Sequence, residues 1–258
     1  MRKSLFFPLA ALAALALGAA PAVAVTTHTV LYKSTPAEGT VSVPSLGAEA
    51  YSFNQIGNEV ILRPHHAPIK HVSVTMESWA CQTGGWSTGD CSTTPGSTFQ
   101  APITLHLYRY SHTNDSTGEV TPGREIMSVT RTFNIRYRPS SESPTESRFM
   151  GSDGKLHNGI AQTVSFPVHR ALGNDVVWTV SYDTNTSGLE PLGHTGPMDS
   201  LNVGLAPATS VGHDRFPGSI FWDTRQAGFA NGAPFVTGEL NRDSGWTGYV
   251  PAAKFSTR

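Results

Sequence analysis

The sequence is poor in charged residues. Asp, Glu, Lys and Arg make up only 14% of its 258 residues, against roughly 25% in an ordinary soluble domain. It also holds 25 glycines and 18 prolines, which interrupt regular helices. This balance excludes long solvated helices and coiled coils. A basic excess is missing too, because the formal net charge is -1, and this argues against a nucleic-acid partner.

Only one long hydrophobic run is present, and it lies at the N-terminus. Arg2 and Lys3 precede an apolar stretch over 5–20, and the small residues Ala-Val-Ala follow at 22–24. This order is typical of a secretory signal peptide. We therefore predict a signal peptide over 1–24 and a secreted, extracellular chain that has no membrane span after processing.

Cysteine is nearly absent. The two cysteines, Cys81 and Cys91, both follow the predicted cleavage point, and an even number in an exported protein implies a disulfide. We predict a Cys81–Cys91 bond that closes a small local loop. A zinc site needs three or four ligands, and no His stands at a suitable spacing beside these thiols.

A sustained helical period with caps is also missing from the mature part, where period-two alternation recurs instead. The candidate strands are 28–33, 49–53, 59–63, 72–77, 103–108, 126–135, 160–168, 176–182, 201–205 and 219–222. Turn pairs such as Gly57-Asn58 separate them. Because such strands have one polar face and no helices to cover it, we predict an all-β fold: a two-layer antiparallel β-sandwich, jelly-roll-like. Residues 25–258 are expected to form a single domain, with 138–147 as a flexible loop.

Several short runs carry a resemblance that covers most of the mature chain. They are SWACQ at 78–82, Trp86, GDCSTTPG at 89–96, PITL at 102–105, TPG at 121–123 and RYRPS at 136–140. Together they resemble uncharacterised exported proteins of high-GC Gram-positive bacteria. The resemblance implies a signal peptide and a sandwich-like β domain, and it brings no catalytic residues.

One short motif suggests catalysis. Residues 85–89, Gly-Trp-Ser-Thr-Gly, match the G-x-S-x-G pattern of α/β-hydrolases, with Ser87 as the nucleophile. That chemistry needs a strand-to-helix turn that presents the hydroxyl at a helix N-terminus. Ser87 instead lies in the predicted disulfide loop and is followed by a turn sequence. A secreted hydrolase that uses Ser87 is therefore kept only as a third alternative.

Histidine patterns offer a metal hypothesis. His65 and His66 are adjacent and His71 is near, but adjacent residues of a strand point to opposite faces. Only one of the first two could therefore join His71 in one site without a turn. Surface histidines on strand edges are the simpler interpretation, and we predict no metal and no cofactor.

Aspartates in turns leave calcium and glycoside hydrolysis open. The pairs with suitable oxygens are Asp183 with Asn185 and Asp199 with Asn202. Asx turns explain such positions without an ion. A glycosidase needs two carboxyl groups that can be distant in sequence, and no pair stands out here.

Aromatic residues suggest a ligand. Trp79, Trp178 and Trp222 are expected in the core, whereas three others lie in Gly-rich loops, namely Trp86, Trp246 and Tyr249. A flat aromatic ring in a loop can stack on a sugar, although the same rings can also cover the ends of the core. We therefore expect a non-catalytic module that binds extracellular polysaccharide or cell-envelope glycan through these residues. The alternative is a structural or adhesive surface protein that binds another protein; the sequence leaves the oligomeric state open.

Overall fold

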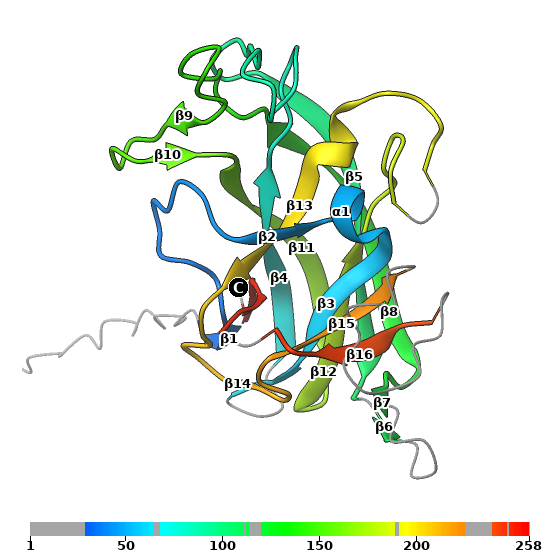
Figure 1. Ribbon diagram of the computed structural model, residues 1–258. Coiled ribbons are helices and arrows are strands. Elements are labelled where there is room, and N and C mark those ends of the chain that lie inside the picture. Colours follow the sequence, from blue (N-terminus) through cyan, green and yellow to red (C-terminus); the bar gives the residue numbers. More distant parts are fainter. Residues whose placement is uncertain are drawn as a thin grey trace, which may run out of the picture.

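Two large antiparallel sheets packed face to face make up the protein (Figure 1). The computed structural model describes residues 29–63, 68–110, 112–113, 120–188, 191–224, 239–246 and 248–257. The predicted all-β sandwich is confirmed. The predicted signal peptide lies outside the described residues. Within the described ranges, no helix is long and apolar enough to cross a membrane.

The first sheet, called sheet 1, has β4 at its centre. β4 pairs with β11 along one edge and with β18 and β13 along the other, and β1, β2 and β17 extend the sheet beyond these. Its strands are β1 (Val30–Lys33), β2 (Ser45–Gly47), β4 (Pro68–Ser78), β11 (Ile160–Ala171), β13 (Leu201–Ala206), β17 (Val250–Pro251) and β18 (Ala253–Ser256).

The second sheet, called sheet 2, runs in the order β16-β15-β3-β12-β5-β8, and β14 also pairs with β3. Its strands are β3 (Phe53–Ile61), β5 (Thr98–Arg109), β8 (Glu125–Arg136), β12 (Asp175–Ser181), β14 (His213–Asp214), β15 (Ser219–Thr224) and β16 (Asn241–Ser244).

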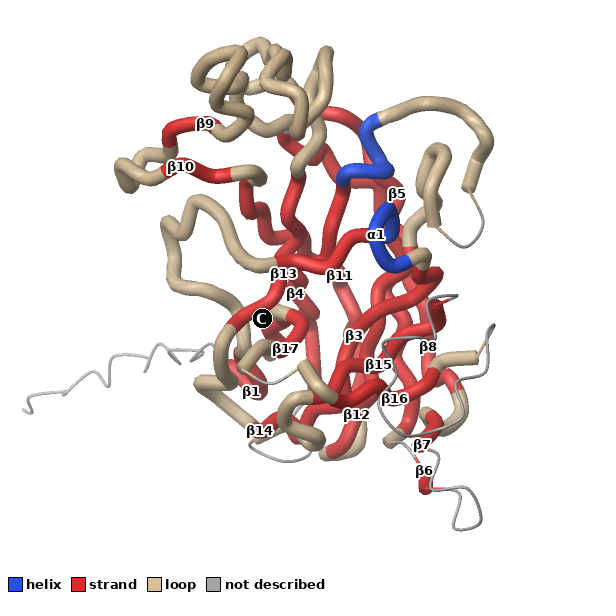
Figure 2. The backbone as a smooth tube through the Cα atoms, viewed as in Figure 1, coloured by secondary structure: helices blue, strands red, loops and turns tan. Residues whose placement is uncertain are grey.

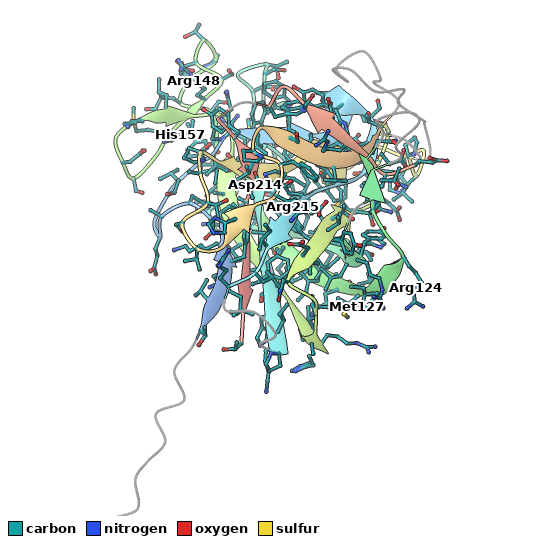
Figure 3. The ribbon with its side chains drawn as sticks, turned by 90° about the horizontal axis from the view of Figure 1, so that it is seen from below. Arg124, Met127, Arg148, His157, Asp214 and Arg215 are labelled. Atoms are coloured by element: carbon teal, nitrogen blue, oxygen red, sulfur yellow. A yellow bond between two sulfur atoms is a disulfide. The ribbon has the colours of Figure 1, made fainter. Side chains whose placement is uncertain are left out.

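Short elements complete the described chain (Figure 2). They are the helix α1 (Ala48–Tyr51), the 3-10 turn η1 (Pro197–Ser200), and the small strand pairs β6 (His112–Thr113) with β7 (Val120–Thr121) and β9 (Phe149–Met150) with β10 (Leu156–His157). In Figure 3, which views the sandwich from below, Arg148 and His157 beside β9 and β10 lie on the opposite side from Arg124 and Met127 at the start of β8.

The space between the sheets is filled by the apolar side chains that alternate with polar ones along each strand and point inward. Val72, Val74 and Met76 of β4 face Leu105 and Trp178 of sheet 2 across one continuous core. Trp178 and Trp222 are fully buried, as predicted, and each contributes on the order of 3–5 kcal/mol to stability by mutational precedent. Packing of this core, rather than the single disulfide, holds the two layers together.

Two local predictions are wrong. Gly57-Asn58 is no turn, because both residues lie inside β3, where Gly57 pairs with Thr179 and a Cβ would collide with the Trp178 main chain. Residues 49–53 do not form one strand either. Ala48–Tyr51 is a single helical turn that ends at Ser52 in the left-handed region, and β3 starts only at Phe53.

Candidate functional site

The outer face of sheet 1 carries a row of polar side chains. Alternation along β4 turns Val72, Val74 and Met76 into the core and leaves Ser73, Thr75 and Glu77 on the opposite face. Those three are nevertheless buried, at 6%, 1% and 0% exposed. Something other than the second sheet must therefore cover this face.

The cover is the connection between β1 and β2, residues 34–44, which we call the arch. It crosses the outer face of sheet 1 and is the wide blue loop in Figure 1. The Ala161 N–H of β11 donates to Val41 O at 2.8 Å, and the Leu205 N–H of β13 donates to Pro44 O at 2.7 Å. The arch is thus fixed to strands on both sides of β4.

Glu77 ties the middle of the arch to the sheet. The Ser42 hydroxyl donates to Oε1 at 2.6 Å and the Val43 N–H donates to Oε2 at 3.3 Å. Burial raises the pKa of Glu77 to about 8, although these two hydrogen bonds and the charge of Arg136 oppose the rise. At neutral pH this carboxyl group is therefore largely protonated. It holds the arch through hydrogen bonds to Ser42 and Val43 and not through a negative charge.

A groove of about 1000 Å³ lies between the arch, the outer face of sheet 1 and strand β9. Its floor includes Ser73 and Thr75 of β4 and Thr163 of β11, and Met150 of β9 stands at its edge with half of its surface exposed. The Thr75 hydroxyl is buried and has no hydrogen-bond partner within the part of the chain that the structure describes. A groove with this lining suits a ligand rich in hydroxyl groups.

Positive charge collects around this groove. Lys33 of β1, Lys254 of β18 and Arg136 of β8 line it, and Glu38 of the arch is the only acidic residue among its described lining residues. The whole chain has 18 basic and 19 acidic residues. The groove is therefore more positive than the protein as a whole.

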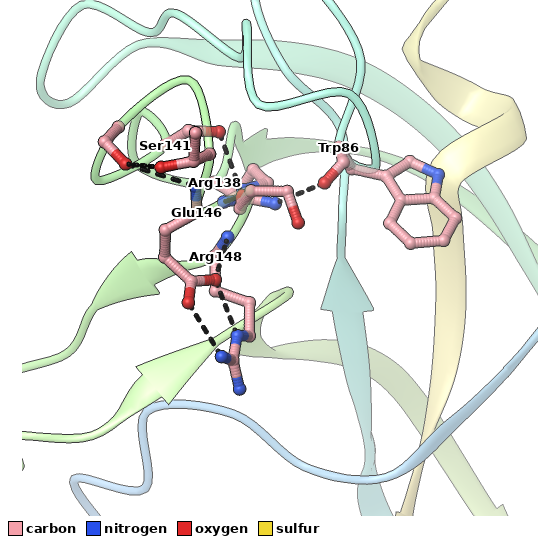
Figure 4. A network of polar contacts seen from close by, with 8 residues as sticks. Trp86, Arg138, Ser141, Glu146 and Arg148 are labelled. Carbon is pink, nitrogen blue, oxygen red and sulfur yellow. Dashed lines mark hydrogen bonds and ion pairs between the residues drawn. The ribbon is translucent and has the colours of Figure 1, made fainter.

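The predicted Cys81–Cys91 disulfide is confirmed, with the two Cα atoms 5.4 Å apart. Its loop is held by the buried Arg138, whose guanidinium donates to Trp86 O at 3.2 Å and to Ser147 O at 2.6 Å (Figure 4). Burial lowers the pKa of Arg138 to about 10. The stretch 138–147, which we expected to be flexible, is thus tied to the disulfide loop through this side chain.

Trp86 is half buried. Its ring meets Trp79 edge to face with centroids 4.7 Å apart, and its indole N–H contacts the Glu49 carboxylate of α1. Burial and the nearby Asp199 raise the pKa of Glu49, and the Trp86 contact opposes this rise. Much of the ring that we predicted for sugar stacking is therefore engaged within the protein.

Trp246 and Tyr249 lie in another loop, after β16. Trp246 packs edge to face against Trp222, with centroids 5.4 Å apart, and its indole N–H donates to Asp243 at 3.3 Å. Tyr249 is 42% exposed and borders a hollow of about 330 Å³. None of the three predicted binding aromatics, Trp86 included, lines the groove, and their role in ligand binding stays a prediction.

Ser87 is exposed in a turn of the disulfide loop. Over the described residues 79–97 no helix follows it, so the strand-to-helix setting of the hydrolase motif is not found. The loop is organised instead by Asp90, which accepts hydrogen bonds from the Gly85 N–H at 2.9 Å and from the Thr88 hydroxyl. The G-x-S-x-G match is thus explained by turn formation.

The structure gives little support to a metal site at the histidines or at the turn aspartates. His65 and His66 lie outside the described residues, and His71 packs against His169 with ring centroids 6.2 Å apart. Asp199 accepts hydrogen bonds from the main-chain N–H groups of residues 185–187 and from the Thr186 hydroxyl, which account for its carboxylate. Among the residues searched, no group of three His, Cys, Asp or Glu side chains could hold a metal ion.

The outer face of sheet 2 contains a chain of three residues with the order of a catalytic triad. Glu125 Oε1 lies 3.2 Å from His106 Nδ1, and His106 Nε2 lies 2.9 Å from Ser181 Oγ. Ser181 lies on the central strand β12, which pairs with both β3 and β5. The main-chain N–H groups near it are therefore used in hydrogen bonds of the sheet, and few are left to stabilise an oxyanion. Similar polar pairs continue across this face, such as Thr104 with Thr130 at 2.7 Å. We interpret the chain as part of this polar ladder.

The groove was not predicted from the sequence, although the alternation in β4 already indicated the polar residues that form part of its floor. The alternation over 72–77 already placed Ser73, Thr75 and Glu77 on one face. The crossing of the arch over that face depends on long-range contacts. Comparison with known proteins gives no further guide: the chain matches no protein-family model, no curated protein and no solved structure.

Proposed function

We propose that this chain is an exported, non-catalytic binding module that holds an extracellular polysaccharide or cell-envelope glycan in the groove under the arch. The observation that carries the proposal is the groove itself: about 1000 Å³ of space over a sheet face lined by hydroxyl, amide and cationic side chains. Sugars are recognised by such polar groups together with small apolar surfaces, and the half-exposed Met150 supplies the latter here.

The rigidity of the site also supports binding. Its floor consists of hydrogen-bonded strands, and its roof is fixed by the contacts of Val41, Ser42 and Val43. A preformed groove loses less conformational entropy on binding than a mobile loop does. We include in the proposal that the sandwich has the jelly-roll-like connection order expected from the sequence.

The protein-binding alternative is less well supported. Such a surface needs a contiguous exposed apolar patch. The large exposed apolar side chains of the described residues are Tyr110, Met150, Leu192 and Tyr249, and they come from four separate segments. A glycan ligand in the groove therefore remains the better interpretation.

The proposal is tested by filling the groove with a large side chain and measuring polysaccharide binding. Thr163 is exposed on its floor, so Thr163→Trp would occupy the space, whereas Thr132→Trp places the same side chain at an exposed position of β8 that does not line it. Retention of purified protein on a panel of immobilised polysaccharides is measured, with thermal melting to check folding. We expect Thr163→Trp to lose retention and Thr132→Trp to keep it. Absence of retention on every polysaccharide, or equal retention of both variants, would contradict the proposal.

A further inference from the structure

Two lysines of the groove stand directly opposite each other. β1 and β18 are antiparallel neighbours, and their register pairs Lys33 with Lys254. The same row continues to Ser73 of β4 and Ser165 of β11. Like charges directly opposite on neighbouring strands destabilise a sheet. The fold therefore keeps an unfavourable pair at this point of the groove.

Among the described residues, no salt bridge to an acidic side chain compensates this pair. Glu38, the acidic residue of the lining, is an exposed residue of the arch. Glu77, the carboxyl group on the same face of β4, is largely protonated because burial raises its pKa to about 8. Positive charge thus remains over the floor.

Arg136 adds a third cation. One of its N–H groups donates to Ala161 O at 2.6 Å, which holds the side chain against β11 at the edge of the groove. A guanidinium has five N–H donors in a planar fork and binds carboxylates in a bidentate manner. The remaining donors can therefore serve a ligand, and the bond to β11 fixes their position.

We propose that the groove selects anionic polysaccharides, whose sugar carboxylates are bound by Lys33, Lys254 and Arg136 while the exposed Thr163 contacts a hydroxyl group. This inference rests on the proposed function and names its ligand class. A ligand anion would remove the repulsion between Lys33 and Lys254, so part of the binding free energy comes from relief of that unfavourable pair. A polysaccharide with the same backbone but no charge offers no such gain.

The experiment uses polygalacturonate and its fully methyl-esterified form, which have the same sugar backbone, with each charged carboxylate of the first replaced by a neutral methyl ester in the second. Affinities for both are measured with the wild-type protein, with Lys33→Gln/Lys254→Gln, and with Lys70→Gln, which changes an exposed lysine that does not line the groove. We expect wild type to prefer the charged form at least tenfold, with affinity that falls as salt increases. We expect the double variant to lose about tenfold, equivalent to about 1.4 kcal/mol, on the charged form alone. Lys70→Gln should behave like wild type.

The outcomes separate the two proposals. Equal binding of both forms, unaffected by the double variant, would overturn the anionic preference and leave a glycan-binding groove. Binding of neither form, with no retention on any other polysaccharide, would overturn the proposed function itself. A thymidine homopolymer is included as an anion without sugar carboxylates; if it binds as tightly as polygalacturonate, the groove is a general polyanion surface and the inference is wrong.

Discussion

The two outer faces of the sandwich use their polar residues differently. On sheet 2 the polar side chains satisfy one another, as in the contacts of Thr104 with Thr130 and of His106 with Ser181. On sheet 1 the face is roofed by the arch, and it keeps a buried hydroxyl on Thr75 and the opposed pair Lys33 and Lys254. The polar groups of the first face are paired within the protein, whereas those of the second leave the charge and hydroxyl groups on which the proposed ligand binding depends.

The largest expected difference between the two faces is in how their carboxyl groups make the free energy of unfolding depend on pH. The pKa of Glu77 is about 8 in the folded protein and its ordinary value is 4.5, so the folded state binds more protons between these values. The contribution of Glu77 to stability is therefore full below pH 4.5 and declines as pH rises to about 8, by several kcal/mol at about 1.4 kcal/mol per pKa unit. Glu77→Gln should reduce this decline, and the part that remains belongs to the other carboxyl groups whose pKa values burial raises, Glu49 and Asp214. Urea unfolding at a series of pH values measures it.

The matched control for this prediction is Glu125→Gln on the outer face of sheet 2, where the carboxylate is partly exposed and contacts His106. This variant should keep the decline between pH 4.5 and 8. A wild-type protein whose unfolding free energy is constant over that range would show that Glu77 is not held in its neutral form.

A smaller difference is expected from single hydroxyl groups. Ser42→Ala removes the donor to the buried Glu77, and a buried polar atom that loses its partner costs roughly 1–3 kcal/mol. Thr104→Ala removes an exposed cross-strand contact worth roughly 0.2–1 kcal/mol. Chemical unfolding of both variants at pH 6 provides the comparison. Equal losses would show that the arch adds nothing to the burial of its face.

The smallest effect concerns the opposed lysines and has the opposite sign. Without ligand, Lys254→Gln should increase stability by roughly 0.2–1 kcal/mol, because it removes the repulsion from Lys33. Lys70→Gln should leave stability unchanged. Thermal melting at low salt detects the gain, and high salt should diminish it. Loss of stability in Lys254→Gln would mean that the lysine is compensated in the native protein.

The sequence predicted what depends on local pattern. Alternation placed Val74 and Trp178 in the core, and the two cysteines implied their bond. Gly57 was misread because a glycine in a strand and a glycine in a turn look alike until the neighbouring backbone of Trp178 is placed. The groove could not be predicted, since Lys33 and Lys254 lie near opposite ends of the described chain and become partners only through the pairing of β1 with β18.

The aromatic residues illustrate the same limit. Trp86 and Trp246 stand in Gly-rich loops, as an exposed binding ring would, yet their indole N–H groups contact Glu49 and Asp243. Local sequence shows that a ring lies in a loop but not which carboxylate meets it. Two of the contacts that cover these rings come from distant residues, Glu49 for Trp86 and Trp222 for Trp246, whereas Asp243 is a local partner three residues before Trp246.

The most direct test of a ligand groove on one face is amide chemical-shift mapping with ¹⁵N-labelled protein and short oligomers of galacturonate. The shifts are predicted to cluster in the arch, in β11 around Ala161–Thr163 and in β18 around Lys254. Shifts confined to the outer face of sheet 2, or to the loops of Trp86, Trp246 and Tyr249, would contradict the assignment of binding to the groove.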